Sequence, residues 1–135
     1  EAMYAAMPGA GATLSGRPIH ASDEAQPGRA NVLANRQAME PRHWAGAEAP
    51  RVKRHFRSSI AYRLCLVAEG RFDATFTFRP TWEWDVAAGS LIVAEAGGTV
   101  TDRRGAEPAF NRARPQLDGI LAGGAVHGAL LAALV

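Results

Sequence analysis

The 135-residue sequence lacks the features that mark several classes of protein. Its one cysteine, Cys65, excludes an intramolecular disulfide framework and a cysteine-based zinc cluster. No run reaches the ~18 apolar residues that a transmembrane helix needs. No charged-then-apolar signal sequence opens the chain. These absences predict a soluble, cytoplasmic protein that does not bind a membrane.

Lysine is almost absent, since 14 of the 15 basic residues are arginine and Lys53 is the exception. The 13 acidic residues leave a net charge of +2, and the longest basic run is the pair Arg103-Arg104. This balance excludes a binder of nucleic acid polymers. Coding bias is one explanation of the arginines. Recognition of an acidic small molecule is the other, because a guanidinium group suits phosphate and carboxylate.

The composition is that of a globular protein, with 47% hydrophobic and 21% charged residues. The length is that of one domain. The first residue is Glu1 rather than methionine, and the chain opens inside a patterned segment. We therefore expect the chain to be a piece of a longer protein.

Residue patterns predict an α/β architecture. Short alternating stretches between glycine turns predict β-hairpins in residues 1–22, and a polar seam follows at 23–30. Residues 36–50 and 106–116 read as loops. Further elements are expected as strands at 31–35, 52–57, 73–78, 99–101 and 119–122, and as helices at 60–69, 86–96 and 126–135. The alternating order from residue 51 on predicts a layered α/β domain over 31–135, preceded by a hairpin unit over 1–30.

Local signals set several element boundaries. Ser58 or Ser59 is expected to cap the helix at 60–69, and Gly70 to follow its end. Pro80 is expected to end the strand at 73–78. Asp85 is expected to cap the helix at 86–96.

The most informative stretch is EWDVAAG at residues 83–89, followed by EAGG at 95–98. Asp85 stands at a predicted helix N-terminus just after a strand, where a carboxylate reaches a crevice at the edge of a sheet. The pattern alone favours a helix cap. The other role is a ligand of a divalent metal, of which one aspartate forms only a part.

These residues resemble the C-terminal signature of the inositol monophosphatase superfamily, the Mg²⁺-dependent, lithium-sensitive phosphatases of small molecules. Two further regions are similar to that family in the correct order. GAGA at 9–12 with SGRPI at 15–19 is similar to its glycine hairpin. RSSIA at 57–61 with LVAEG at 66–70 is similar to the strand–helix–strand before the signature.

The resemblance implies a fold and a site. The fold is α/β, the C-terminal half of a layered αβαβα sugar-phosphatase-like sandwich, with residues 1–30 as a remnant of the first antiparallel sheet. Asp85 would bind a Mg²⁺ ion. Ser58, Ser59 and Ile60 would line the substrate pocket, although Ser58 stands where many members have glycine. The partners implied are the missing N-terminal half and, in a homodimer, a second copy.

Two acidic motifs of the family are absent from residues 1–135: the Gly-Glu-Glu-type glutamate and the Asp-Pro-Ile-Asp-Gly-Thr-type loop. The implied reaction is metal-assisted hydrolysis of a phosphomonoester. Without those motifs we expect the chain to be inactive alone. The alternative function is a non-catalytic α/β fragment for binding or dimerisation.

Two substrate classes compete within the phosphatase hypothesis. One is inositol monophosphate or another polyol phosphate, and the other is a 3′(2′),5′-bisphosphate nucleotide. The runs EWDVAAG at 83–89 and SIAY at 59–62 resemble those of several bacterial bisphosphate nucleotidases, which favours the nucleotide.

Other polar residues receive ordinary roles. Glu69 and Glu95 are expected at the surface, and Arg79 is either a solvated loop cation or faces an anionic substrate. Trp82 and Trp84 are expected as core and rim aromatics. Four histidines show no metal-ligand spacing and are expected as ordinary polar or half-buried residues: His20, His43, His55 and His127.

Overall fold

The structure is a computed structural model that describes residues 2–110 and 113–135. Its first sheet is an antiparallel meander in the order β1-β2-β3. The strands are β1 (Tyr4–Ala6), β2 (Ala12–Leu14) and β3 (Arg17–Ile19). The turns between them use glycines with positive φ, which include Gly9 and Gly16. The hairpins predicted in residues 1–22 are therefore confirmed.

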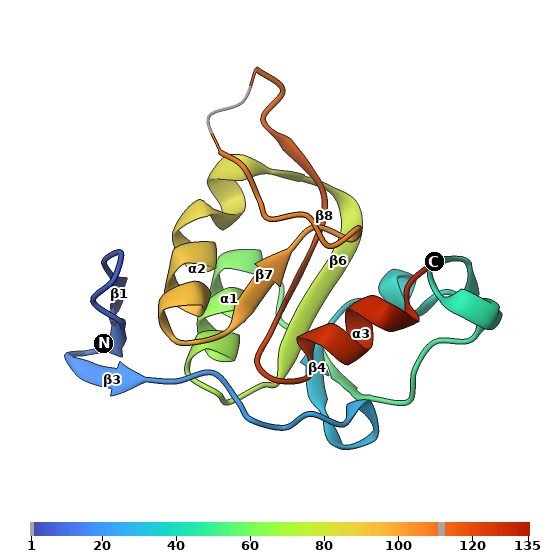
Figure 1. The fold of residues 1–135 in the computed structure, drawn as a ribbon, viewed down its shortest axis with the longest axis horizontal. Coiled ribbons are helices and arrows are strands. Elements are labelled where there is room, and N and C mark those ends of the chain that lie inside the picture. Colours follow the sequence, from blue (N-terminus) through green and yellow to red (C-terminus); the bar gives the residue numbers. More distant parts are fainter. Residues whose placement is uncertain (1, 111–112) are drawn as a thin grey trace.

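A second, five-stranded sheet has the order β5-β4-β6-β8-β7 (Figure 1). In this sheet β4 runs parallel to β5 and β6, while β8 runs antiparallel to β6 and β7. The strands are β4 (Asn31–Leu33), β5 (Lys53–His55), β6 (Ala74–Trp82), β7 (Thr99–Thr101) and β8 (Gln116–Gly123).

The helices follow the predicted order, since β5, α1, β6, α2, β7, β8 and α3 succeed one another. They are α1 (Ile60–Ala68), α2 (Glu83–Glu95) and α3 (His127–Ala133). Short 3₁₀ turns lie at Pro27–Arg29, Arg36–Met39, Pro41–His43 and Ala45–Ala47. The last three occupy the predicted loop at 36–50. The predicted loop at 106–116 includes residues 111–112, which lie outside the described residues.

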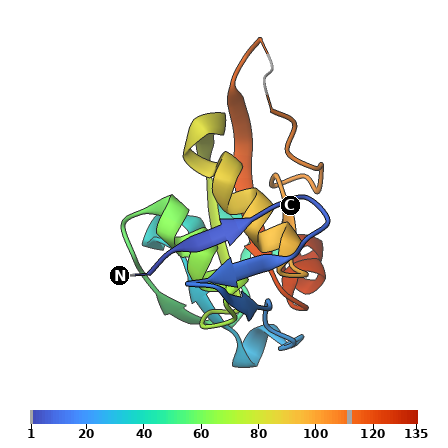
Figure 2. The same cartoon turned by 90° about the vertical axis from the view of Figure 1, so that its left-hand side faces the viewer.

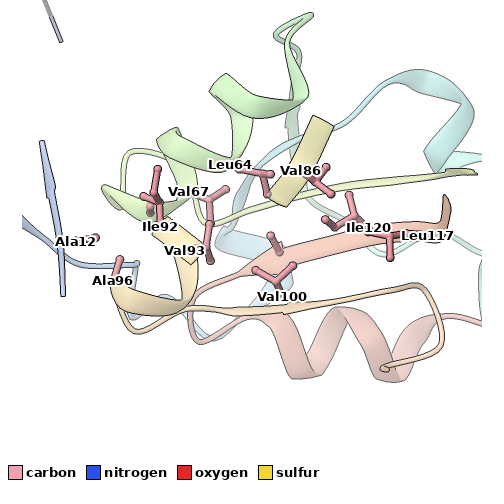
Figure 3. Close-up of a cluster of buried hydrophobic side chains, with 12 residues drawn as sticks. Ala12, Leu64, Val67, Val86, Ile92, Val93, Ala96, Val100, Leu117 and Ile120 are labelled. Carbon is pink, nitrogen blue, oxygen red and sulfur yellow. The ribbon is translucent and has the colours of Figure 1, made fainter. Parts of the chain in front are cut away.

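Successive residues of β6 and β8 point to opposite faces of the larger sheet. Both faces are buried, because each is covered by packed elements. Ile120 belongs to the cluster under α1 and α2, whereas Leu121 belongs to the cluster under α3. Figure 3 shows the first cluster, in which side chains from α1, α2, β7 and β8 converge. The two clusters make the layered α/β arrangement that the sequence predicts.

The second cluster is built around aromatic rings. Trp44 packs edge-on against Phe76 and Phe78, with ring centroids 5.6 and 5.7 Å away. Its indole Nε1 donates a 2.9 Å hydrogen bond to the Ala38 carbonyl. The 3₁₀ turns of residues 36–47 thereby close the sheet face beside α3.

The first sheet lies against α2, as Figure 2 shows. The Tyr4 hydroxyl donates a 3.1 Å hydrogen bond to Glu69 Oε1, and the Gly11 amide donates a 2.9 Å bond to Glu95 Oε1. The prediction that the two glutamates are exposed is wrong. Both are only partly accessible, and both accept hydrogen bonds from the first sheet and its turns. Ala12 of β2 joins the cluster under α2. The boundary at residue 30 stays a prediction.

Strand β6 continues past Pro80 to Trp82, so the predicted end at this proline is wrong. The register of β6 on β8 shifts between Thr77 and Pro80, which marks a β-bulge. A bulge interrupts the ladder and so tolerates a proline. Gly119 lies opposite with a φ of +72°, and a Cβ there would lie 2.7 Å from the Thr77 carbonyl oxygen. The bulge therefore needs glycine on its partner strand.

Candidate functional site

A cleft of about 390 Å³ opens where the start of α1, the end of β6 and the first turn of α2 meet. We call it the Asp85 cleft. Its lining residues are Ile60, Arg63, Thr77, Arg79, Pro80, Thr81, Trp82 and Asp85. Two of the residues predicted for the site, Ile60 and Asp85, are thus brought together. Ser58 and Ser59 are not among the lining residues.

Asp85 reaches this position because α2 starts directly after β6, with no loop between them. The helix begins at Glu83, its N-cap position is Trp82, and Asp85 is its third residue. The expected N-cap role of Asp85 is therefore wrong. The Asp85 side chain is exposed, and its negative charge suits the positive end of the helix dipole.

The close packing of α1 and α2 holds the two walls of the cleft. Gly89 of α2 faces Leu64 of α1, and a Cβ at Gly89 would lie 2.6 Å from Leu64 Cδ1. A larger side chain would push the helices apart. Glycine at position 89 is therefore what lets α2 lie this close to α1.

The two serines stand at the N-terminus of α1 and are exposed. Ser59 is the N-cap, and its Oγ accepts a 3.2 Å hydrogen bond from the Tyr62 amide. Gly70 follows the end of the helix with a φ of +77°. The predicted cap and terminating glycine are confirmed. A substrate contact by Ser58 or Ser59 stays a prediction.

Arg63 is a lining residue that the sequence reasoning missed. It is only 5% exposed, and its Nε and Nη1 have no hydrogen-bond partner among the described residues. Its guanidinium carbon lies 5.7 Å from the centre of the Phe56 ring. Burial lowers the pKa of Arg63, and the charge of Arg79 lowers it further. The available signal was spacing, because position 63 follows Ile60 by three and precedes Val67 by four, on the buried face of α1.

Two tryptophans stand beside the cleft. The rings of Trp82 and Trp84 stack with centroids 4.7 Å apart and an angle of 9° between their planes. They are 42% and 65% exposed, so they fit the predicted rim position and not the core.

The histidines have separate, ordinary surroundings. His127 Nε2 lies 3.0 Å from Thr101 Oγ1, and His43 Nδ1 lies 3.4 Å from Arg103 Nη2. Burial lowers the pKa of both rings, and in His43 the charge of Arg103 adds to the effect. Both histidines are buried, which is deeper than the half-buried positions expected, and each lies beside a polar partner.

The residues present do not form a magnesium site by themselves. Within residues 2–110 and 113–135, no group of three or more histidine, cysteine, aspartate or glutamate side chains is placed to hold a metal ion. Of the described residues that line its cleft, Asp85 is the one that supplies an exposed carboxylate. A bound Mg²⁺ would need further oxygen ligands.

The comparison with known families decides the wider assignment. The model of the inositol monophosphatase family matches residues 1–135. The chain belongs to the inositol monophosphatase family. This family is one of phosphatases, which confirms the resemblance read from residues 83–98.

Two curated relatives match over most of this chain and under half of their own length. Inositol monophosphatase 2 of Solanum lycopersicum is 36% identical over 115 residues, covering 79% of this chain and 43% of the relative. The fructose-1,6-bisphosphatase/inositol-1-monophosphatase of Thermococcus kodakarensis is 40% identical over 112 residues, covering 79% and 40%.

A solved structure supports the fold. Inositol monophosphatase from Anabaena (Nostoc) sp. PCC 7120 superposes with a TM-score of 0.78 at 26% identity, covering 98% of this chain and 53% of that one. The predicted α/β fold is confirmed, and the chain spans about half the length of the proteins that it matches. In the described part of the chain, no helix is long and apolar enough to span a membrane.

Proposed function

We propose that this chain is the C-terminal half of a Mg²⁺-dependent phosphomonoesterase that hydrolyses a small phosphorylated metabolite. The observation that carries the proposal is the convergence of Asp85 and Ile60 in one cleft. Family membership supplies the reaction class. Because the chain spans about half of its relatives, we expect it to need the rest of the fold for turnover.

In this proposal Asp85 is one ligand of the metal ion, and the remaining ligands come from the half of the fold outside this chain. Ile60, Ser58 and Ser59 contact the substrate with backbone and hydroxyl groups at the start of α1. That end of a helix carries backbone N–H groups without helical partners, which suit a phosphorylated ligand. The cytoplasmic location expected from the sequence stays part of the proposal.

Two substrate classes remain within the proposal, a polyol monophosphate such as inositol monophosphate and a 3′(2′),5′-bisphosphate nucleotide. The name of the Thermococcus relative joins a sugar bisphosphate and an inositol monophosphate, so it does not decide between the two classes. Turnover of the two substrates by the full-length protein, measured side by side, separates them. If the full-length protein hydrolyses neither substrate, the division into these two substrate classes is wrong.

The test of the site is Asp85→Asn in the full-length protein. We expect phosphatase activity and its Mg²⁺ dependence to be lost. The melting temperature should barely change, because an exposed carboxylate in the first helical turn contributes only ~0.3–1 kcal/mol.

The matched control for this test is Asp118→Asn. Asp118 is an exposed carboxylate of β8, and its Oδ2 lies 3.0 Å from Arg104 Nε. This variant should keep its activity. If Asp85→Asn also stays active, the metal role of Asp85 is wrong, and its effect on the helix end is what remains.

The second candidate function is a non-catalytic α/β unit that binds a ligand or forms a homodimer. It is favoured by the lack of three convergent metal ligands in the residues that the structure describes. The intact mass of the protein and the sequence of its gene distinguish the two. A gene product that carries the two acidic motifs supports the phosphatase. A short product that self-associates without turnover supports the binding unit.

A further inference from the structure

The Asp85 cleft contains a buried cation, Arg63, that forms no ion pair with a carboxylate of the described residues. Arg63 is 5% exposed, and two of its three guanidinium nitrogens have no hydrogen-bond partner among the described residues. A buried cation is costly unless it is paired and hydrogen-bonded. A methionine or leucine at this position would pack on the same helix face without that cost. An arginine at this position would be accounted for by an anion that is not part of the described chain.

The cation that shares the cleft strengthens this reading. Arg79 also lines the Asp85 cleft, and its charge repels that of Arg63, which lowers the pKa of Arg63 beyond the effect of burial. Asp85 does not neutralise the pair, because no ion pair within 4.0 Å joins it to either arginine in the described part of the chain. Two cations converge where an anionic group would relieve both.

We propose that Arg63 and Arg79 form a subsite for a second acidic group of the substrate, a phosphate or a carboxylate, beside the phosphate that is hydrolysed. Guanidinium groups suit these oxyanions because they offer several directed N–H donors. This inference rests on the proposed function. It favours a substrate with two anionic groups, such as a bisphosphate, over a polyol monophosphate, whose single phosphate is the one hydrolysed and whose uncharged polyol would leave Arg63 unpaired.

The first experiment compares two substrates in the full-length protein, a nucleoside 3′,5′-bisphosphate and the matching nucleoside 3′-monophosphate. In Arg63→Gln we expect KM for the bisphosphate to rise roughly tenfold to hundredfold, the equivalent of one or two lost charged hydrogen bonds. Its kcat should stay within about twofold, as should KM for the monophosphate.

The control for this experiment is Arg71→Gln. Arg71 is an exposed arginine just after α1, where its Nη1 lies 3.4 Å from Glu69 Oε1, and it does not line the cleft. It should leave both substrates unaffected. Equal changes of KM for the two substrates in Arg63→Gln would overturn the subsite.

A second experiment measures stability and needs no turnover. Arg63→Met in the full-length protein should raise the melting temperature, because it removes an unpaired buried charge. Inorganic pyrophosphate, used as the probe, should raise the melting temperature of the wild type and not of this variant. A purely structural arginine, held by Phe56 or by the rest of the fold, would give a lower melting temperature on substitution and no Arg63-dependent effect of pyrophosphate.

These readouts separate the two proposals. If the wild type hydrolyses neither nucleotide but pyrophosphate stabilises it through Arg63, the phosphatase proposal fails and the anion site stands. If the wild type hydrolyses both nucleotides and Arg63→Met lowers its stability, the phosphatase stands and the anion site fails.

Discussion

Two buried charges at opposite ends of β6 have contrasting surroundings. Asp73, 9% exposed, precedes the strand, and its carboxylate accepts hydrogen bonds from Ser22 Oγ at 2.5 Å and from the Asn31 amide at 2.7 Å. Arg63, 5% exposed, lies in the cleft at the other end, where it contacts the Phe56 ring and its Nε and Nη1 have no hydrogen-bond partner among the described residues. Buried polar groups in folded proteins are normally hydrogen-bonded, so it is Arg63 that needs an explanation.

The backbone of Asp73 extends the contrast. Its amide donates to the Asn31 carbonyl at 2.8 Å, and its carbonyl accepts from the Gly124 amide at 3.1 Å. Asp73 therefore connects β4, β6 and the end of β8 with the segment that enters from the first sheet. The charge at this end of β6 serves the fold. Departures from satisfied burial cluster at functional sites, which supports the proposal that the functional site lies at the cleft end.

The largest expected effect comes from Asp73→Ala, which tests whether Asp73 is as structural as its contacts indicate. The free energy of unfolding should fall by about 3 kcal/mol, because two hydrogen bonds to a charged acceptor are lost and their donors stay partly buried. Urea unfolding measures this change. The exposed Asp23→Ala should change the value by no more than ~0.5 kcal/mol. If Asp73→Ala and Asp23→Ala lower the free energy of unfolding equally, Asp73 is not a structural charge, and its contrast with Arg63 is lost.

The next effect concerns the packing that forms the cleft. Gly89→Val should lower the free energy of unfolding by about 2 kcal/mol, because the new side chain meets Leu64. Activity should fall with it, as the helices that carry Ile60 and Asp85 separate. The control is Ala88→Val, a β-branched substitution at an exposed position of the same helix, which should cost under ~0.7 kcal/mol. A well-tolerated valine at position 89 would mean that the two helices do not set the width of the cleft.

Local signals were sufficient for much of the fold. The cap at Ser59 and the glycine at position 70 fix both ends of α1, because a helix end is determined by the few residues around it. The alternation of strands and helices from residue 51 on predicted a layered domain. Asp85 and Ile60 were placed in one site by resemblance, and the structure puts both in one cleft.

What the sequence could not predict depends on residues far along the chain. Strand β6 passes Pro80 because β8 supplies Gly119 opposite the bulge, 39 positions later. The Glu95 carboxylate accepts a hydrogen bond from the backbone amide of Gly11, 84 residues away. Arg63 is a charged residue at a position on the buried face of a helix. Local sequence patterns do not show whether such a residue will be buried or exposed. The helix face that it shares with Ile60 and Val67 points to burial, while charge points to solvent.

A smaller effect is expected from Phe56, whose ring contacts the Arg63 guanidinium. Phe56→Leu should lower the free energy of unfolding by ~0.5–1 kcal/mol, because the ring is the described partner of the guanidinium. Phe56 is itself 48% exposed, which limits the packing loss. The same substitution in an Arg63→Met background is the control, and there most of the cost should disappear. An undiminished cost would show that Phe56 acts by packing and not through the cation.

The smallest expected effect is the loss of stability when low pH protonates the buried imidazole of His127. His127 is 6% exposed, its Nε2 lies 3.0 Å from Thr101 Oγ1, and burial lowers its pKa below the ordinary 6.5. The folded state therefore binds this proton less readily than the unfolded state. The stability contribution is complete above pH 6.5 and is lost as pH falls through the lowered folded-state pKa.

Urea unfolding between pH 7 and pH 5 should accordingly show a decline of stability that is shallower in His127→Gln. Some slope should persist, because the pKa of His43 is lowered as well. The exposed His20→Gln should leave the slope of the wild type unchanged. If His127→Gln does the same, a charged imidazolium is tolerated beside Thr101. Burial without a counter-charge would then be cheap in this fold, and the inference that Arg63 awaits an anion would lose its premise.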